Sequence, residues 1–109
     1  MKNGILTLAG LGLLFAVAPL RMTAADGDAK KGATVFENCA GCHNSDSTET
    51  KVGPGLKDLF KREKLVNGKP VNAENVKGIV TEGSGGMPPF GDSISAGDKD
   101  DLVAYLMTL

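Results

Sequence analysis

The clearest hydrophobic pattern in the chain lies at its C-terminal end. Apolar residues recur there at helical spacing, at Leu102, Tyr105, Leu106 and Leu109. This i, i+3, i+4, i+7 pattern is typical of an amphipathic helix. Ser95, with Asp98 three residues later, resembles a capping box at the start of such a helix. We therefore predict a final helix that begins after Ser95 and packs one face against the rest of the domain.

Two shorter helices are predicted in the middle of the chain. Asn72 is suited to cap a helix, and Gly83 is suited to end it. The segment between them has one apolar face, formed by Val76, Ile79 and Val80. Leu56, Leu59 and Phe60 also have helical spacing, which predicts a short helix that runs through about Arg62.

The segment before the two cysteines is the fourth predicted helix, with Asp28 as its N-cap and with Gly32 and Phe36 on one face. Turn-forming residues separate the helices, at Gly53-Pro54-Gly55, at Asn67-Gly68 and around Pro88-Pro89. No segment alternates apolar and polar residues as a strand would. The pattern predicts an all-α domain of about four short helices and long loops.

The first 25 residues have a different pattern. Met1 and Lys2 precede an uncharged run from Gly4 to Leu20, and small residues follow at Ala24 and Ala25. A positively charged start, an apolar stretch and small residues at the cleavage site are typical of a secretory signal peptide. We predict a signal peptide at residues 1–25, with cleavage after Ala25 or alternatively after Ala24, and a domain at residues 26–109. The alternative is an uncleaved membrane anchor, for which the run is short.

Charge composition excludes one class of partner. The chain has 12 Lys plus Arg and 13 Asp plus Glu. Loss of Lys2 and Arg21 with the signal peptide leaves 10 basic against 13 acidic residues, a formal charge of −3. A mildly acidic domain without a basic stripe is not expected to bind nucleic acid. The acidic balance favours a protein partner whose surface carries some positive charge.

The candidate chemistry is concentrated in Cys39-Ala40-Gly41-Cys42-His43, which holds both cysteines and the only histidine. A structural disulfide between Cys39 and Cys42 would close too small a loop to stabilise the domain. A redox-active dithiol normally accompanies a βαβ unit, which the pattern lacks. A structural zinc site needs four ligands, so a carboxylate would have to join these three residues.

Covalently attached haem is the third interpretation, and we favour it because Cys-x-x-Cys-His is the attachment sequence of c-type haem. Two cysteines three residues apart on a helical turn reach two neighbouring vinyl groups, and the following histidine lies under the iron. Four short helices also bury little surface by themselves, and a large apolar cofactor would complete the core. We therefore predict one haem c per chain.

Met87 is the predicted second axial ligand of the iron. A second histidine ligand is excluded within one chain, since His43 is the only histidine. Met1 and Met22 belong to the export segment, and Met107 lies within the last predicted helix, where a packing role suits it better. Met87 lies in "GGMPPF", where Pro88 and Pro89 stiffen the backbone that would hold a weak thioether ligand.

These motifs together resemble those of a small, bacterial, class I cytochrome c. "GATVFENCAGCH", "KVGPGLKDLF", "GGMPPFG" and "DLVAYL" occur in the order of that family and cover nearly all of residues 26–109. The resemblance implies the class I cytochrome c fold wrapped around one haem. It also implies that the first and last helices cross, with Gly32 and Phe36 against Leu102 and Tyr105.

The resemblance also implies roles for individual residues. Cys39 and Cys42 would form the thioethers, and His43 and Met87 would bind the iron. The carbonyl of Pro54 would accept a hydrogen bond from the ring of His43. The remaining predicted cofactor contacts are Leu56 and Phe90, as walls of the haem site, and Arg62, at a haem propionate.

The expected function is electron transfer rather than enzymatic catalysis, since an iron with two protein ligands offers no open position to a substrate. We expect a periplasmic monomer, with no membrane span in its mature form, that docks transiently with a redox donor and a redox acceptor. The alternatives are a haem-based sensor or weak peroxidase with a labile Met87 bond, and a membrane-anchored haem subunit of a larger redox complex.

Overall fold

The computed structural model describes residues 27–109, whose regular elements are all helical and are joined by long loops. Its elements are α1 (Ala29–Val35), the 3₁₀ turns η1 (Phe36–Asn38) and η2 (Leu59–Lys61), α2 (Ala73–Glu82) and α3 (Ala96–Leu106). Residues 27–109 contain no β-strand, only isolated bridges between Lys64 and Pro70 and between Ser84 and Met87. The all-α prediction is confirmed. The predicted signal peptide lies outside the described residues.

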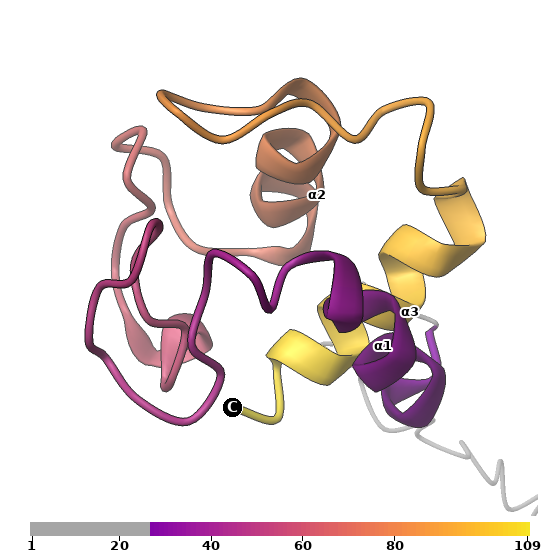
Figure 1. Ribbon diagram of the computed structural model, residues 1–109, viewed down its shortest axis with the longest axis horizontal. Coiled ribbons are helices and arrows are strands. Elements are labelled where there is room, and N and C mark those ends of the chain that lie inside the picture. The colour runs from indigo at the N-terminus through magenta and orange to yellow at the C-terminus, as the bar shows by residue number, and fades with distance from the viewer. Residues whose placement is uncertain (1–26) are drawn as a thin grey trace, which may run out of the picture.

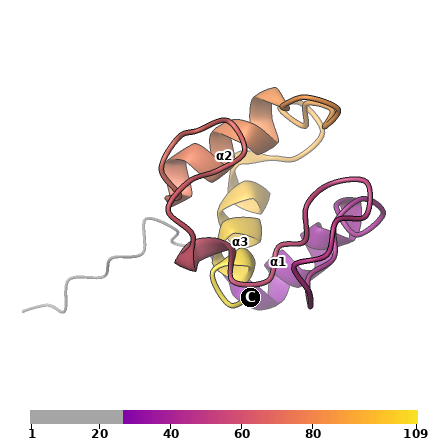
Figure 2. The same ribbon diagram turned by 90° about the vertical axis from the view of Figure 1, so that its left-hand side faces the viewer.

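Helices α1 and α3 cross closely beside each other, while α2 packs on another side of α3, above the crossing in both views (Figures 1 and 2). At the crossing, a Cβ atom placed on Gly32 would collide with the carbonyl of Asp101 and lie 2.7 Å from Cβ of Tyr105. The rings of Phe36 and Tyr105 pack with their centroids 5.3 Å apart. Glycine is therefore needed for this approach, and the predicted packing of the first helix on Tyr105 is confirmed.

Side-chain caps start each α-helix at the residue that the sequence indicates. Asp28 accepts hydrogen bonds from the backbone of Lys30 and Lys31, Asn72 accepts one from Asn75, and Ser95 accepts one from Asp98. Caps of this kind bind backbone N–H groups that have no partner within the helix. They fix where the three helices begin.

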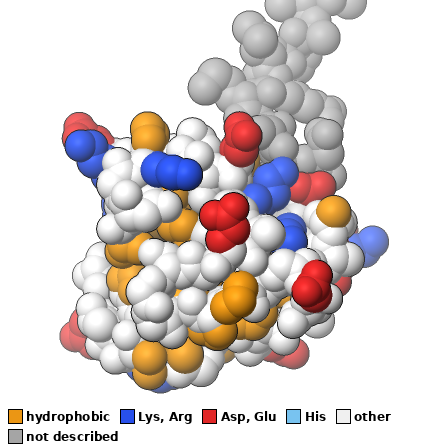
Figure 3. Space-filling view, turned by 90° about the horizontal axis from the view of Figure 1, so that it is seen from above, with side chains coloured by type: hydrophobic (Ala, Val, Ile, Leu, Met, Phe, Trp, Pro, Cys, Tyr) orange, Lys and Arg blue, Asp and Glu red, His pale blue; other side chains and the backbone are white. Residues whose placement is uncertain are grey.

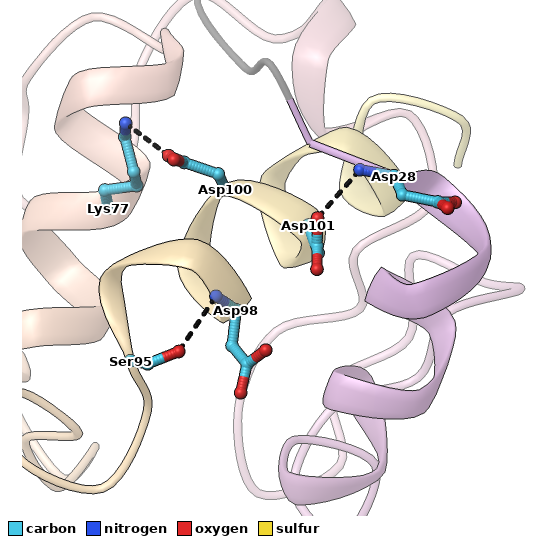
Figure 4. A network of polar contacts seen from close by, with 6 residues as sticks. All are labelled: Asp28, Lys77, Ser95, Asp98, Asp100 and Asp101. Atoms are coloured by element: carbon cyan, nitrogen blue, oxygen red, sulfur yellow. Dashed lines mark hydrogen bonds and ion pairs between the residues drawn. The ribbon is translucent and has the colours of Figure 1, made fainter.

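A small polar network joins the N-terminal end of the domain to α3 (Figure 4). The backbone N–H of Asp28 donates to a carboxylate oxygen of Asp101 at 2.8 Å. Lys77 of α2 forms an ion pair with Asp100 at 2.8 Å. One turn of α3 thus holds α2 on one side and the start of α1 on the other.

The predicted short helix before Arg62 is wrong in its length. Asp58 has a positive φ of 60°, a left-handed conformation that a continuous α-helix does not allow. Only the 3₁₀ turn η2 follows it, and Leu56 lies outside that turn. The helical spacing of Leu56, Leu59 and Phe60 instead reflects three side chains that pack against one core.

The core lies between α3 and the other elements. Leu102 and Val103 are the most deeply buried side chains, with 1% and 0% of their surface exposed. The core as a whole comprises Phe36, Cys39, Leu59, Ala73, Val76, Val80, Ile94, Leu102, Val103 and Leu106. Among residues 27–109, we find no helix with the length and apolar character needed to cross a bilayer.

Candidate functional site

The two cysteines and the histidine lie on one helical turn that continues from η1. The backbone N–H of Cys39 donates to Phe36 at 2.7 Å, and that of His43 donates back to the carbonyl of Cys39 at 2.9 Å. An i to i+4 bond of this kind is the repeat of an α-helix. The predicted helical turn from Cys39 to His43 is therefore present.

Cys39 and Cys42 are free thiols with different environments, since Cys39 is buried and Cys42 is exposed. Burial, followed by the neighbouring Cys42, raises the pKa of the Cys39 thiol above its ordinary value. A raised pKa keeps this thiol protonated and neutral at neutral pH. Both thiols lie at the place where the sequence predicts covalent attachment.

The ring of His43 is oriented by a backbone carbonyl. Its Nδ1 atom lies 2.8 Å from the carbonyl oxygen of Pro54. A carbonyl only accepts hydrogen bonds, so Nδ1 must carry the ring proton in this arrangement. In the neutral imidazole with its proton on Nδ1, Nε2 is the atom that can bind a metal.

The segment from Lys51 to Pro54 wraps around the cysteine turn. The backbone N–H of Gly53 donates to the carbonyl of Cys42 at 2.7 Å, and the ammonium of Lys51 donates to the carbonyl of Ala40 at 3.2 Å. A Cβ atom on Gly53 would lie 2.8 Å from Nδ1 of His43 and 2.9 Å from its Nε2. The imidazole therefore rests directly on the glycine backbone, and a larger residue at position 53 would displace it.

Met87 lies on a tight turn that is fastened to the end of α2. Ser84 and Met87 exchange two backbone hydrogen bonds, of 3.2 Å and 2.9 Å. Gly83 ends α2 with a positive φ of 77°, and a Cβ atom there would lie 2.5 Å from the carbonyl oxygen of Met87. The backbone N–H of Phe90 then donates to Val80 at 2.9 Å, which returns the loop to the helix. Met87 is thus held on a short, well-braced loop.

A single apolar cavity of about 330 Å³ joins these elements. All the residues predicted to contact a cofactor or iron line it, namely Cys39, Cys42, His43, Pro54, Leu56, Arg62, Met87 and Phe90. Cavities that hold cofactors commonly have volumes of about 300–1,000 Å³ and mostly apolar walls. Two thiols, an imidazole and a thioether in one apolar cavity form a donor set that fits a covalently attached haem.

Arg62 lines the cavity, and its guanidinium also binds the loop at residues 55–57. Nη2 of Arg62 donates to the carbonyls of Gly55 and Lys57, each at 2.7 Å. These bonds join the residue directly after η2 to the loop directly before it. The expected contact of Arg62 with a haem propionate stays a prediction.

Several residues of the cavity wall were not predicted from the sequence. Gly53 was interpreted only as part of a turn, although it provides the space that the His43 ring occupies. Val76, Ile79 and Val80 were expected to form an ordinary helix face, yet they line the cavity together with Leu65. Their helical spacing indicates a buried face and does not say whether protein or cofactor covers it.

Helices around one apolar cavity, with Cys-x-x-Cys-His on its wall, define the class of c-type haem proteins. Residues 27–106 match the family described as "Cytochrome C oxidase, cbb3-type, subunit III".

Similarity to individual cytochromes supports the same class. The chain is 34% identical over 77 residues to cytochrome c6 of Microcystis aeruginosa, covering 70% of this chain and 90% of that protein. It is 37% identical over 87 residues to the cbb3-type cytochrome c oxidase subunit FixP of Sinorhizobium medicae, covering 72% of this chain but only 29% of FixP. The solved structure of cytochrome c6 from the diatom Phaeodactylum tricornutum matches with a TM-score of 0.61 and 26% identity, covering 75% of this chain and 93% of the diatom chain.

The chain belongs to the class I cytochrome c family. It is an electron-transfer cytochrome with covalently bound haem c. The predicted family, fold class and cofactor are confirmed.

Proposed function

We propose that this chain is an exported, monomeric electron carrier whose iron is bound by His43 and Met87, with Cys39 and Cys42 as the thioether residues. The observation that carries the proposal is that these four side chains line one cavity. Leu56 and Phe90 would form apolar walls, Pro54 would orient His43, and Arg62 would meet a propionate. As a carrier, the protein would pass one electron between a donor and an acceptor and would not act as an enzyme.

Haem c supplies a one-electron change between ferrous and ferric iron. The chain's part is to keep both ligands still during that change, since small rearrangement favours fast electron transfer. The bond from His43 to Pro54 fixes one ligand, and the braced turn from Ser84 to Met87 fixes the other. Apolar walls exclude water and, with a thioether ligand, raise the reduction potential.

Export is part of the proposal. Residues 1–25 would be removed after Ala25 or Ala24, leaving the domain free in the periplasm. The apolar run from Gly4 to Leu20 and the small residues after it support this. N-terminal sequencing of the purified protein tests it. A mature chain that begins at Asp26 or Ala25 is expected, and one that retains Met1 would indicate an anchored form.

Replacement of Met87 by alanine tests the ligand assignment. The ferric wild-type protein is expected to show the weak long-wavelength absorption band of methionine-to-iron charge transfer at neutral pH. Met87→Ala should lose that band, lower the reduction potential and let carbon monoxide bind the ferrous protein.

The matched control is Met107→Leu, which keeps nearly the same volume at a partly buried core position. It should retain the band and the resistance to carbon monoxide. If Met87→Ala and wild type have the same spectrum and potential, Met87 is not the ligand. If wild type binds carbon monoxide readily, a sensor or peroxidase function replaces the carrier.

A further inference from the structure

Charge is distributed very unevenly along the described chain. Residues 51–69 contain six basic side chains, Lys51, Lys57, Lys61, Arg62, Lys64 and Lys69, against two acidic ones, Asp58 and Glu63. The rest of the described chain contains four basic and ten acidic side chains. One segment therefore carries a formal charge of +4, while the remainder of residues 27–109 carries −6. The net acidity of the domain does not describe the surface of this segment.

The basic segment also forms one wall of the cavity. It contributes Pro54, Leu56, Arg62 and Leu65 to the lining, together with Val52 and Val66. Val52 and Val66 are the two large hydrophobic residues with high exposure among residues 27–109, at 76% and 73%. Because both residues also line the cavity, a bound haem would cover part of each side chain, and the part left exposed beside the haem is apolar surface for another protein.

The lysines lie next to these exposed valines. Lys51 directly precedes Val52, and Lys64 and Lys69 flank Val66 in the turn closed by the bridge from Lys64 to Pro70. In Figure 2 the loop around residue 50 and the loop around residue 65 lie on opposite sides of the face turned toward the viewer. Figure 3, which looks down on α2 and the Met87 loop, shows hydrophobic side chains gathered toward its left and lower parts.

Little of this positive charge is neutralised within the described chain. Its two ion pairs join Lys61 to Asp58 and Lys77 to Asp100, and only the first lies in the basic segment. Lys51, Lys64 and Lys69 are all exposed and form no ion pair with the other described residues. Their charge is therefore available to a partner.

We infer that the redox partner presents an acidic surface, with an apolar centre, to Val52, Val66 and the lysines beside them. This inference rests on the proposed carrier function and names the chemistry of its partner. Opposite charges around a small contact raise the rate of productive encounter more than they raise affinity. The sign is opposite to the one that the composition of the whole domain favours.

The lysines have a second possible function, which is to neutralise the two haem propionates without any role in docking. Electron exchange with small charged metal complexes distinguishes the two functions. The ferrous holoprotein would be mixed with ferricyanide, an anion, or with tris(phenanthroline)cobalt(III), a cation. Each oxidant takes one electron from the haem iron, which becomes ferric as the complex is reduced.

The local charge predicts the direction in which added salt changes each rate constant. Between about 0.01 M and 0.1 M ionic strength the Debye length falls from about 30 Å to about 10 Å. The ferricyanide rate constant should then fall by roughly tenfold, because steering by the basic segment is screened. The rate constant with the cobalt complex should rise.

Variants assign the effect to the proposed surface. The double variant Lys64→Gln/Lys69→Gln should lose most of the salt dependence with ferricyanide. Because Lys64 lines the cavity, the potential of each variant is measured as well, so that a change in driving force is separated from a change in steering. Lys30→Gln/Lys31→Gln removes the same charge from exposed positions on α1, which do not line the cavity, and should behave as wild type.

Three results would overturn the inference. They are a ferricyanide rate that is flat or rises with salt, a Lys64/Lys69 variant that matches wild type, and an α1 variant with the larger effect. Failure of the carrier function gives a different result, since the ferrous protein would then react slowly with both complexes at every ionic strength.

Discussion

Nδ1 of His43 and the carbonyl oxygen of Pro54 lie 2.8 Å apart, although eleven positions of chain separate the two residues. The bond closes the loop between them and fixes the orientation of the imidazole, which lines the cavity. It depends on Gly53, because the ring rests where a side chain at position 53 would begin. The backbone of Gly53 and Pro54 thus sets the orientation of the proposed iron ligand.

Replacement of Gly53 by alanine should alter the haem iron as well as stability. The new Cβ atom would push the imidazole away and lengthen its bond to Pro54. A weaker bond makes the imidazole a poorer electron donor, which destabilises ferric iron and raises the reduction potential. Potentiometric titration and the EPR spectrum of the ferric protein measure the effect.

Gly41→Ala is the matched control, since it lies between the cysteines and a Cβ atom there meets nothing within 4 Å. It should keep the wild-type potential and EPR spectrum. Should Gly53→Ala also keep both, the close packing of the ring on Gly53 has no influence on the iron. An NOE between Gly53 Hα and the His43 ring in the ferrous wild-type protein tests the contact without any substitution.

Truncation of Leu102 should destabilise the fold strongly, since only 1% of its side chain is exposed at the centre of α3. Leu102→Ala should lower the free energy of unfolding by about 2–5 kcal/mol, through lost burial and the cavity that remains. Guanidinium titration of the holoprotein measures it. Lys30→Ala, at an exposed position on α1 outside the cavity, should change the free energy by less than about 0.5 kcal/mol. Equal losses in the two variants would mean that the core is not centred on α3.

Loss of the N-terminal cap on α3 should lower the free energy of unfolding by a moderate amount. The side chain of Ser95 accepts a hydrogen bond from the backbone N–H of Asp98 at 3.1 Å. Ser95→Ala should cost about 1 kcal/mol of stability, because that N–H loses its partner. Ser93→Ala removes a hydroxyl from a nearby exposed residue outside the helix and should be close to neutral. Similar denaturation midpoints for the two variants would contradict the role of Ser95 as a cap.

The sequence predicted best those features that depend on local chemistry. Asp28, Asn72 and Ser95 cap helices where their side chains allow it, and Gly83 ends α2 as expected. Cys39, Cys42 and His43 were predicted as site residues from a contiguous motif and Met87 from a distinctive loop, and their roles at the iron stay predictions. All of them line one cavity.

Features that depend on distant contacts were harder to predict. Nothing near Asp58 in the sequence indicates its left-handed backbone, which shortens the helix expected before Arg62. The role of Gly53 depends on a ring ten residues earlier in the chain. Residues 51–69 are basic, but the net charge of the whole domain is acidic because acidic residues elsewhere outnumber them. A sum over the domain therefore does not reveal the charge of this segment.

The most direct test of the central claim, that His43 and Met87 bind the haem iron, is X-ray absorption at the iron edge of the purified holoprotein. Ligation by these two residues should give five nitrogen neighbours, four from the porphyrin and one from His43, and one sulfur neighbour from Met87. The sulfur signal should disappear in Met87→Ala and persist in Met107→Leu. An iron without a sulfur neighbour in the wild-type protein would show that Met87 is not a ligand.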